Sequence, residues 1–187
     1  KEKMEQRMKA LLDTPKDAVL TFQQLGGDQV TVDESQQFKN LFFTTQRRGV
    51  GGFGNPNGSK RAFDMFIKAQ YLQNTHNGRG VAFATGTPIS NSLTELFTLQ
   101  RYLGLDELKN RGMTSLDAWL ANFGVPAVEY ESNVTGTKYK RKERLRRITN
   151  APEVMQLYKQ FTDSVTQEDA KRNYREDNNG AEFPIPR

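Results

Sequence analysis

The sequence contains no cysteine and only one histidine among its 187 residues. Without thiols the chain can form neither disulfide bonds nor thiolate metal sites, and one histidine excludes a histidine-rich metal cluster. The absence of cysteine is typical of a protein from a reducing compartment, so we expect a cytoplasmic location. The histidine, His76, lies in the loop-like stretch NTHNGRG, which predicts a position on the surface.

Long apolar runs are also absent. No stretch is apolar for long enough to span a bilayer, and none resembles a signal peptide, so we expect no membrane partner. Hydrophobic residues make up 35% of the chain and charged residues 26%, which is enough for one core. The formal net charge of +5 permits a nucleic-acid partner without requiring one.

The first residues already follow a helical pattern. In KEKMEQRMKALLD, the apolar residues Met4, Met8, Leu11 and Leu12 recur at helical spacing. Neither a start methionine nor an entry loop precedes them. We therefore expect a piece of a longer protein, in which residues 1–14 are the end of a helical insertion.

Two short apolar runs, at about 29–33 and 81–85, are typical of buried strands. A helix is expected between them, from its N-cap Ser59 to about Gln73, and another follows over 92–103. The order strand, helix, strand, helix predicts an α/β fold with a parallel sheet flanked by helices. Since both strands are apolar nearly throughout, we expect both faces of the sheet to be covered.

A glycine-rich stretch, LFFTTQRRGVGGFGNPNG, occupies residues 41–58. Its segment GVGGFG satisfies the G-x-G-x-x-G pattern of nucleotide-binding loops. That pattern requires a preceding strand and a following helix, whereas here it follows TTQRR and precedes NPNGSK. We interpret the stretch as a mobile surface loop.

Polar residues follow both expected strands. Asp33 and Glu34 end the first, and Thr85, Gly86 and Thr87 end the second. A polar turn explains the two carboxylates equally well when that stretch is considered alone. In parallel α/β sheets, however, ligands bind beyond the carboxyl ends of the strands. If the strands are neighbours, both sets of polar groups face one crevice, and this coincidence favours a site.

Several blocks of the sequence resemble one family. VDESQQFKN resembles the Walker B or DEAH-type box of superfamily-two helicases, and ATGTPISNSLTELFTLQRYL resembles motif III of their Snf-type branch. KNLFF, FATGTPISNS, ELFTLQRYL and LDAWLANFG are similar to the helicase portion of very large phage and mobile-element proteins, which often also carry an adenine-specific DNA methylase. The resemblance covers about residues 15–165. It departs at Ser35-Gln36, where the family more often has a small residue followed by histidine.

The resemblance implies a RecA-like (P-loop NTPase) fold and specific roles for the polar residues. With ATP and Mg²⁺ as cofactors, Asp33 would help to hold the metal through water, and Glu34 would orient or deprotonate the attacking water. Thr85 and Thr87, on either side of Gly86, would couple nucleotide state to DNA. Gln36 is placed to hydrogen-bond between the two loops.

Asn91 and Glu95 also match the family pattern. Ser92 and Glu95 have capping-box spacing, so capping of the helix over 92–103 explains these residues equally well.

Two elements of a complete motor are missing from the sequence. No G-x-x-x-x-G-K-[ST] phosphate loop, the Walker A element, precedes the Walker B-like box, and no second lobe with its arginine finger follows. We therefore expect residues 15–149 to be the latter part of the first RecA-like lobe, and the isolated chain to be inactive. The resemblance implies a second RecA-like lobe, and possibly a methylase domain, in the same parent chain.

Residues 138–147, KYKRKERLRR, form a strongly basic stretch. Such a run is either a solvated face or an edge that contacts phosphates. Around the glycine-rich stretch lies a second candidate patch. The resemblance implies that DNA is held by its backbone, without sequence preference. The candidate DNA contacts are Arg47, Arg48, Lys60, Arg61, Lys140, Arg141, Lys142 and Arg144.

The last third of the sequence contains features of structure and few candidate functional residues apart from the basic stretch. Trp119 and Phe123 are spaced like a core face. Asn150 and Glu153 have capping-box spacing ahead of an amphipathic helix expected over 150–168. The polar, proline-punctuated residues 169–187 have the composition of a linker, which would lead towards the second lobe.

Two functions remain open at this point. The first is part of an ATP-driven DNA translocase or helicase motor. The alternative is a non-catalytic DNA-binding module that retains a relic of the motor fold. A phosphate loop in the preceding part of the parent chain would favour the first, and its absence the second.

Overall fold

The computed structural model describes residues 6, 21–47, 50–51, 53–89, 94–132, 139–182 and 184. For residues 50–51, 126–129, 131–132 and 139–146 it describes the backbone alone. The expected helix over residues 1–13 and the residues Arg48, Asn91 and Ser92 lie outside the described part. None of the described helices is both long and apolar enough to cross a membrane.

The two expected strands form a parallel pair. Strand β1 (Val30–Val32) lies beside β3 (Val81–Phe83), with Val30 opposite Val81. Helix α2 (Lys60–Thr75) connects them, as the sequence predicts. The Ser59 side chain accepts a hydrogen bond from the N–H of Ala62 at 3.1 Å and so caps α2 at the expected position.

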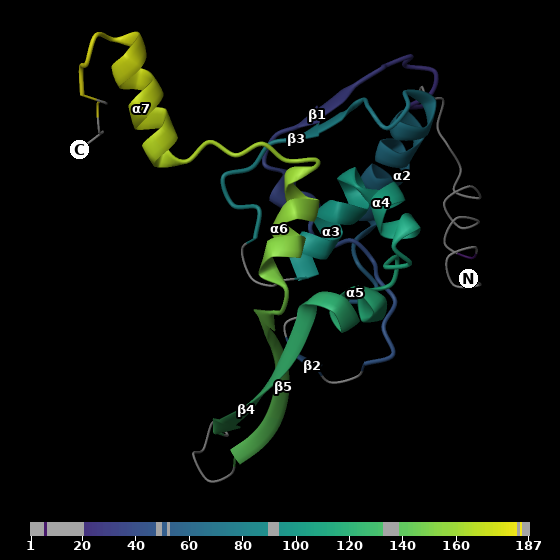
Figure 1. The fold of residues 1–187 in the computed structure, drawn as a ribbon. Coiled ribbons are helices and arrows are strands. Elements are labelled where there is room, and N and C mark those ends of the chain that lie inside the picture. The colour runs from purple at the N-terminus through teal and green to yellow at the C-terminus, as the bar shows by residue number, and fades with distance from the viewer. Residues whose placement is uncertain are drawn as a thin grey trace.

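Only one face of this small sheet is covered. Val32 is buried, whereas Thr31 and Ala82 are exposed. Figure 1 shows α2 and α3 (Thr94–Leu103) on the same side of the two strands. The expectation of two covered faces is wrong for the part of the chain that the structure describes, because the second face carries small residues with no helix packed on them.

The covered face belongs to the first of two apolar clusters. This cluster joins α2 and α3, and its buried members are Leu41, Ala62, Phe66, Ala69 and Tyr102. The loop after α2 is more structured than expected. His76 is half-buried, and its ring Nε2 lies 3.4 Å from the carboxylate of Asp28.

The second apolar cluster is larger and joins α3 to the elements that follow it. These are α4 (Leu105–Asn110), α5 (Leu116–Phe123) and α6 (Ala151–Lys159). Trp119 is fully buried at its centre, and the indole N–H donates to the side chain of Gln100 at 2.7 Å. The interpretation of Trp119 and Phe123 as packing residues is confirmed.

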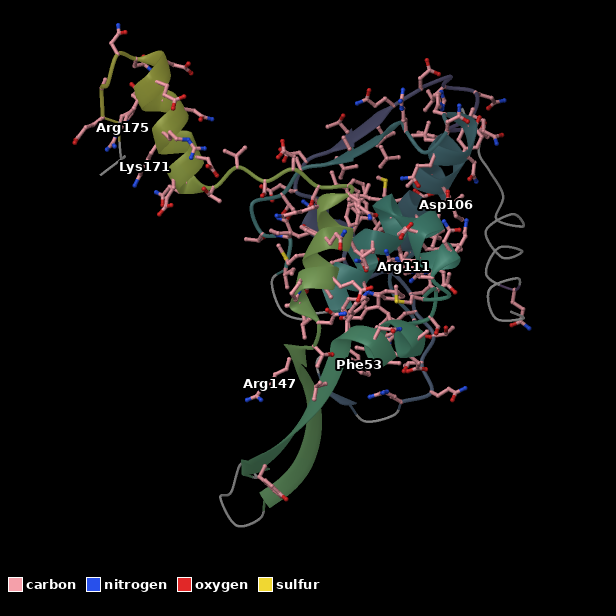
Figure 2. All side chains as sticks on the ribbon, viewed as in Figure 1. Phe53, Asp106, Arg111, Arg147, Lys171 and Arg175 are labelled. Carbon is pink, nitrogen blue, oxygen red and sulfur yellow. The ribbon has the colours of Figure 1, made fainter. Side chains whose placement is uncertain are left out.

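The described residues of the glycine-rich stretch contact the body at several points, so this part is not simply a surface loop. Phe53 is buried in the second cluster and lies beside α5 (Figure 2). The N–H of Phe43 donates to the carbonyl of Pro56 at 3.1 Å. Gly58 has a φ of 65°, and a side chain there would collide with the backbone of Phe42. Aromatic residues and one close backbone approach therefore hold the stretch, despite its glycine content.

The basic stretch forms one strand of a hairpin that the sequence did not reveal. Strands β4 (Gly124–Ser132) and β5 (Tyr139–Ile148) pair antiparallel, and β2 (Val50–Gly51) pairs parallel with β5. Figure 1 shows the hairpin extending away from the helices. We call β4 and β5 together the hairpin arm.

The C-terminal part differs from the expected helix and linker. Helix α6 ends at Lys159, and a separate helix, α7 (Gln167–Asp177), stands away from the body (Figure 1). No capping box forms at α6, since Asn150 adopts a left-handed conformation and its side-chain amide donates to Glu153. A capping box between Thr166 and Asp169 begins α7 instead. Local capping thus makes a helix of residues that have a linker's composition.

Candidate functional site

The carboxyl ends of β1 and β3 meet at the same edge of the sheet, as expected. Asp33 and Glu34 follow β1 directly, and Thr85 is the second residue after β3. Backbone pairing continues beyond the strands, because the N–H of Ser35 donates to the carbonyl of Ala84 at 3.0 Å. The two loops are therefore held together. We call this group of loop residues the strand-end site.

The chain turns sharply at the two carboxylates. Glu34 has a φ of 53° and a ψ of 47°, a left-handed conformation that is uncommon for a residue with a side chain. Its N–H donates to the Asp33 carboxylate at 2.8 Å. The turn leads directly into the 3₁₀ helix η1 (Ser35–Phe38). Both carboxylates are exposed, so they are accessible to a ligand.

Gln36 connects the two loops through its side-chain amide. The amide oxygen accepts a hydrogen bond from the Thr85 hydroxyl at 2.7 Å, and the amide N–H donates to the Glu34 carboxylate. The Thr85 hydroxyl oxygen in turn accepts from the N–H of Thr87 at 3.1 Å. The bond that the sequence predicts between the loops is present. An uninterrupted polar chain thus runs from Thr87 to Glu34.

A charged pair that the sequence did not predict, Lys39 and Glu95, lies near this hydrogen-bonded chain. The ammonium group of Lys39 is 3.2 Å from the Glu95 carboxylate, and the Glu95 side chain is only 10% exposed. The sequence offered capping as the structural role of Glu95. Its position directly before the core residues Leu96 and Phe97 was the available sign of burial. The pair links the segment after η1 to helix α3.

A small cavity separates the Lys39–Glu95 pair from the strand-end site. Ser35, Gln36 and Thr85 line it together with that pair, and its volume is about 10 Å³. The Ser35 hydroxyl is buried and has no hydrogen-bond partner among the described residues. A cavity of this volume is at the lower limit for holding one water molecule.

Two further residues that the sequence did not single out hold η1 and the segment after it in place. The Arg101 guanidinium is buried 4.7 Å from the centre of the Phe42 ring and donates to the Phe42 carbonyl. Burial lowers the pKa of Arg101 to about 10. The Tyr102 hydroxyl donates to the carbonyl of Ala62 at 2.7 Å and lies 3.2 Å from that of Phe38. Burial also raises the pKa of the Tyr102 hydroxyl.

The two carboxylates at the strand ends are oxygen donors of the kind that hard cations such as Mg²⁺ prefer. The described residues include no group of three or more histidine, cysteine, aspartate or glutamate side chains that could hold an ion by themselves. Mg²⁺ that arrives with a nucleotide needs only one or two protein carboxylates, since water and phosphate oxygens complete its coordination. Asp33 and Glu34 fit that requirement.

The candidate DNA contacts near the glycine-rich stretch are divided between two places. The guanidinium of Arg47 lies 4.0 Å from the Asp117 carboxylate on α5. Arg61, on α2, donates to the Gln37 carbonyl at 2.9 Å and so lies beside η1. Lys60 is exposed at the start of α2. No described contact brings Arg47 and Arg61 together into the expected patch.

The remaining candidate contacts lie close together on β5, at residues 140–142 and 144. The register places Lys140 opposite Glu131 and Lys142 opposite Glu129. In contrast, Arg141 is opposite Tyr130 and Arg144 is opposite Ala127. Tyr130 is 71% exposed, and Arg147 projects into solvent at the base of the hairpin arm (Figure 2). Acidic residues thus face the two lysines across the ladder and leave the two arginines without an opposed acid.

Comparison with known proteins agrees with the resemblance at the family level. A family model described as a probable helicase domain matches residues 1–166. Comparisons with curated proteins and with solved structures give no match. The family match spans both loops of the strand-end site, the two apolar clusters and the hairpin arm. The chain therefore belongs to the probable helicase domain family and has a helicase-related role.

Proposed function

We propose that the chain is part of a Snf-type, ATP-dependent DNA translocase or helicase motor that works in the cytoplasm. It would supply the Walker B element, Asp33 and Glu34, and the motif III element, Thr85 to Thr87. The observation that carries the proposal is the hydrogen-bonded chain from Thr85 through Gln36 to Glu34. It joins two loops that are neighbours only because β1 and β3 are parallel.

The two carboxylates would have different tasks. Bound Mg²⁺–ATP supplies the bond to be hydrolysed and the charge that neutralises its phosphates. Asp33, directly beyond β1, would hold the metal through water. Glu34 would orient the attacking water and accept its proton.

Gln36 would replace the histidine that is more usual at this position of the family. An amide offers one acceptor and one donor group at the same time, and here both are used between Thr85 and Glu34. A change at the carboxylate is therefore transmitted to the Thr85 hydroxyl and to the N–H of Thr87. This supports a coupling role for Thr85, Gly86 and Thr87.

The proposal includes the expected domain organisation. Residues 15–149 would be the latter part of a first RecA-like lobe that lacks its Walker A region, preceded by the end of a helical insertion at 1–14. The open face of the two-stranded sheet supports this, because parallel sheets in α/β proteins are covered on both faces. Residues 150–168 and 169–187 would lead towards a second lobe. The parent chain would resemble phage and mobile-element methylase–helicase proteins.

DNA is the proposed partner, bound through its backbone. The support comes from the charge of the chain and from the register of β5, where Arg141 and Arg144 have no acidic residue opposite. Of the other candidates, Lys60 and Arg61 lie nearest to the strand-end site, while Arg47 is paired with Asp117.

A non-catalytic DNA-binding module with a relic of the motor fold is the second candidate. The exposed hairpin arm favours it, because the arm can contact DNA without any nucleotide. The two candidates differ in whether the strand-end site acts on ATP.

The test uses the longer protein that the proposal requires. Glu34→Gln is expected to abolish most ATP hydrolysis while nucleotide binding is retained, since it affects water activation and leaves the grip on the phosphates. Asp33→Ala is expected to weaken Mg²⁺-dependent nucleotide binding as well. Wild-type turnover in both variants would refute the Walker B assignment and leave the DNA-binding module. By the same reasoning, the isolated chain is expected to hydrolyse no ATP above background.

A further inference from the structure

A second, larger cavity lies on the other side of the Lys39–Glu95 pair. Its volume is about 270 Å³, and it is enclosed by the segment after η1, the glycine-rich stretch and α3. The apolar part of its wall is formed by Phe43, Phe53 and Phe97. Thr98 adds a polar group beside the charged pair. None of the residues in the polar chain of the strand-end site lines it.

Contacts of the glycine-rich stretch with the rest of the chain build the cavity. Phe53 is 7% exposed and fixed in the second apolar cluster, and the Phe43 N–H is bonded to Pro56. The close approach of Gly58 to Phe42 holds the far end of the glycine-rich stretch against the same segment. The walls are thus preformed, so a ligand would not have to order them on binding.

The walls define the chemistry of an occupant. Phenylalanine rings in the wall suit a flat apolar surface, and the Lys39–Glu95 ion pair and Thr98 give the same cavity a polar side, which suits an occupant with polar atoms at its edge. A nucleobase combines both properties, since it has a π-face and an edge of hydrogen-bond donors and acceptors. The cavity is close to the lower end of the usual range for ligand pockets, about 300 Å³, so its size suits a single planar group.

We propose that this cavity receives one unstacked base of a nucleic-acid strand. The proposal rests on the nucleic-acid partner of the proposed function and adds a base-binding subsite to it. Lys39 and Glu95 line both this cavity and the small one under Ser35 and Thr85. A base that contacts the pair is therefore separated from the strand-end site by one ion pair. This position allows the site to respond to a bound strand.

The experiment compares two labelled strands of equal length, an oligothymidylate and an abasic phosphate–deoxyribose strand, by fluorescence anisotropy with this chain. The oligothymidylate is expected to bind about 10- to 100-fold more tightly, the effect of stacking one base. Phe43→Ala is expected to remove most of this difference. Thr98→Met, which fills the cavity without removing a ring, is expected to do the same.

The matched control is Phe22→Ala, because Phe22 is also half-buried and also lies near a cation, Lys68, at 5.8 Å. It is expected to leave the preference for bases intact. Thermal unfolding of each variant verifies folding. Equal affinity for the two strands, or a preference that survives both cavity variants, would overturn the proposal. Equal affinity with a steep salt dependence would still leave backbone binding in place, so failure of the subsite is distinguishable from failure of DNA binding itself.

Discussion

The strand-end site and the hairpin arm carry the two kinds of candidate residue, and they are constructed in opposite ways. In the strand-end site, contacts connect segments that are far apart in sequence: Thr85 with Gln36, and Glu95 with Lys39. In the arm, an antiparallel ladder with one irregularity, between Val125 and Pro126, places most residues of β5 opposite a residue of β4. The first region depends on the packing of α2 and α3, whereas the second depends mainly on its own two strands.

Because of this difference, we expect the two regions to respond differently to substitution. Around the strand-end site, Arg101 and Tyr102 are buried and bonded to backbone carbonyls of the neighbouring segments. A change there shifts several groups at once, because close-packed interiors transmit strain. An exposed residue of the arm, such as Tyr130, can change without disturbing the body. We therefore expect substitutions of buried residues in the body to lower the free energy of unfolding. Substitutions of exposed residues in the hairpin arm are expected to change the affinity for DNA instead.

The largest expected effect tests this contrast directly. Trp119→Ala removes a fully buried ring and is expected to lower the free energy of unfolding by about 3–5 kcal/mol. Tyr130→Ala, at a side chain that is 71% exposed, is expected to change it by no more than about 0.5 kcal/mol. Urea unfolding monitored by circular dichroism measures both. Similar losses in the two variants would mean that the arm is part of the core.

The next prediction concerns the positive charges of β5 in the hairpin arm. If β5 follows a phosphate backbone, each lost contact reduces the slope of log affinity against log salt by about 0.9 on duplex DNA. Replacing Arg141, Lys142 and Arg144 with glutamine is expected to flatten that slope by up to about 3 units. Affinity is expected to fall equally for unrelated sequences. Salt titration of fluorescent duplex binding provides the measurement.

The register provides a matched control for this titration. A variant with Lys140→Gln and Lys142→Gln removes two positive charges that face glutamates, and a variant with Arg141→Gln and Arg144→Gln removes two that do not. The arginine variant is expected to show the larger change in slope. An unchanged slope in folded variants would identify β5 as a solvated face and make Lys60 and Arg61 the better candidates.

A smaller effect concerns α7, which stands apart from the body. Hydrogen bonds from Thr166 lower the pKa of the Asp169 carboxyl, so the ionised form stabilises the start of the helix. This contribution is complete above the unfolded pKa, about 4, and is lost as the pH falls through the lower folded value. We expect the amide resonances of residues 167–170 to report fraying only in that acidic range. Asp169→Asn is expected to abolish this pH-dependent fraying. If the fraying persists in the variant, Asp169 is not its cause.

Much of the fold near the strand-end site could be predicted because its signals are local. The cap at Ser59, the parallel strands and the core face of Trp119 follow from periodicity and side-chain chemistry. The hairpin arm could not be predicted, since β5 is a charged run whose pairing with β4 is set by neither alternation nor a recognisable turn. Helix α7 was not predicted because the polar composition of residues 169–187 indicated a linker, whereas the capping box between Thr166 and Asp169 starts a helix there.

The site could be predicted only in part, for a related reason. Asp33, Glu34 and Thr85 follow apolar strands, and strand order alone places them at one edge. The Lys39–Glu95 pair and the buried Arg101 depend on how η1 packs against α3, which no local pattern encodes. The candidate patch near the glycine-rich stretch stays a prediction, since Arg47 lies near Asp117 on α5 and Arg61 lies beside η1, and no described contact joins them.

The most direct test of the account is a double-mutant cycle on the bond between the two loops. Gln36→Ala and Thr85→Val each remove one partner of the 2.7 Å hydrogen bond. If Gln36 joins the loops, the two losses in unfolding free energy will be non-additive, with a coupling of about 0.5–1.5 kcal/mol. Losses that add within about 0.3 kcal/mol would show that Gln36 and Thr85 do not couple the two loops, which would contradict the hydrogen-bonded chain on which the proposed function rests.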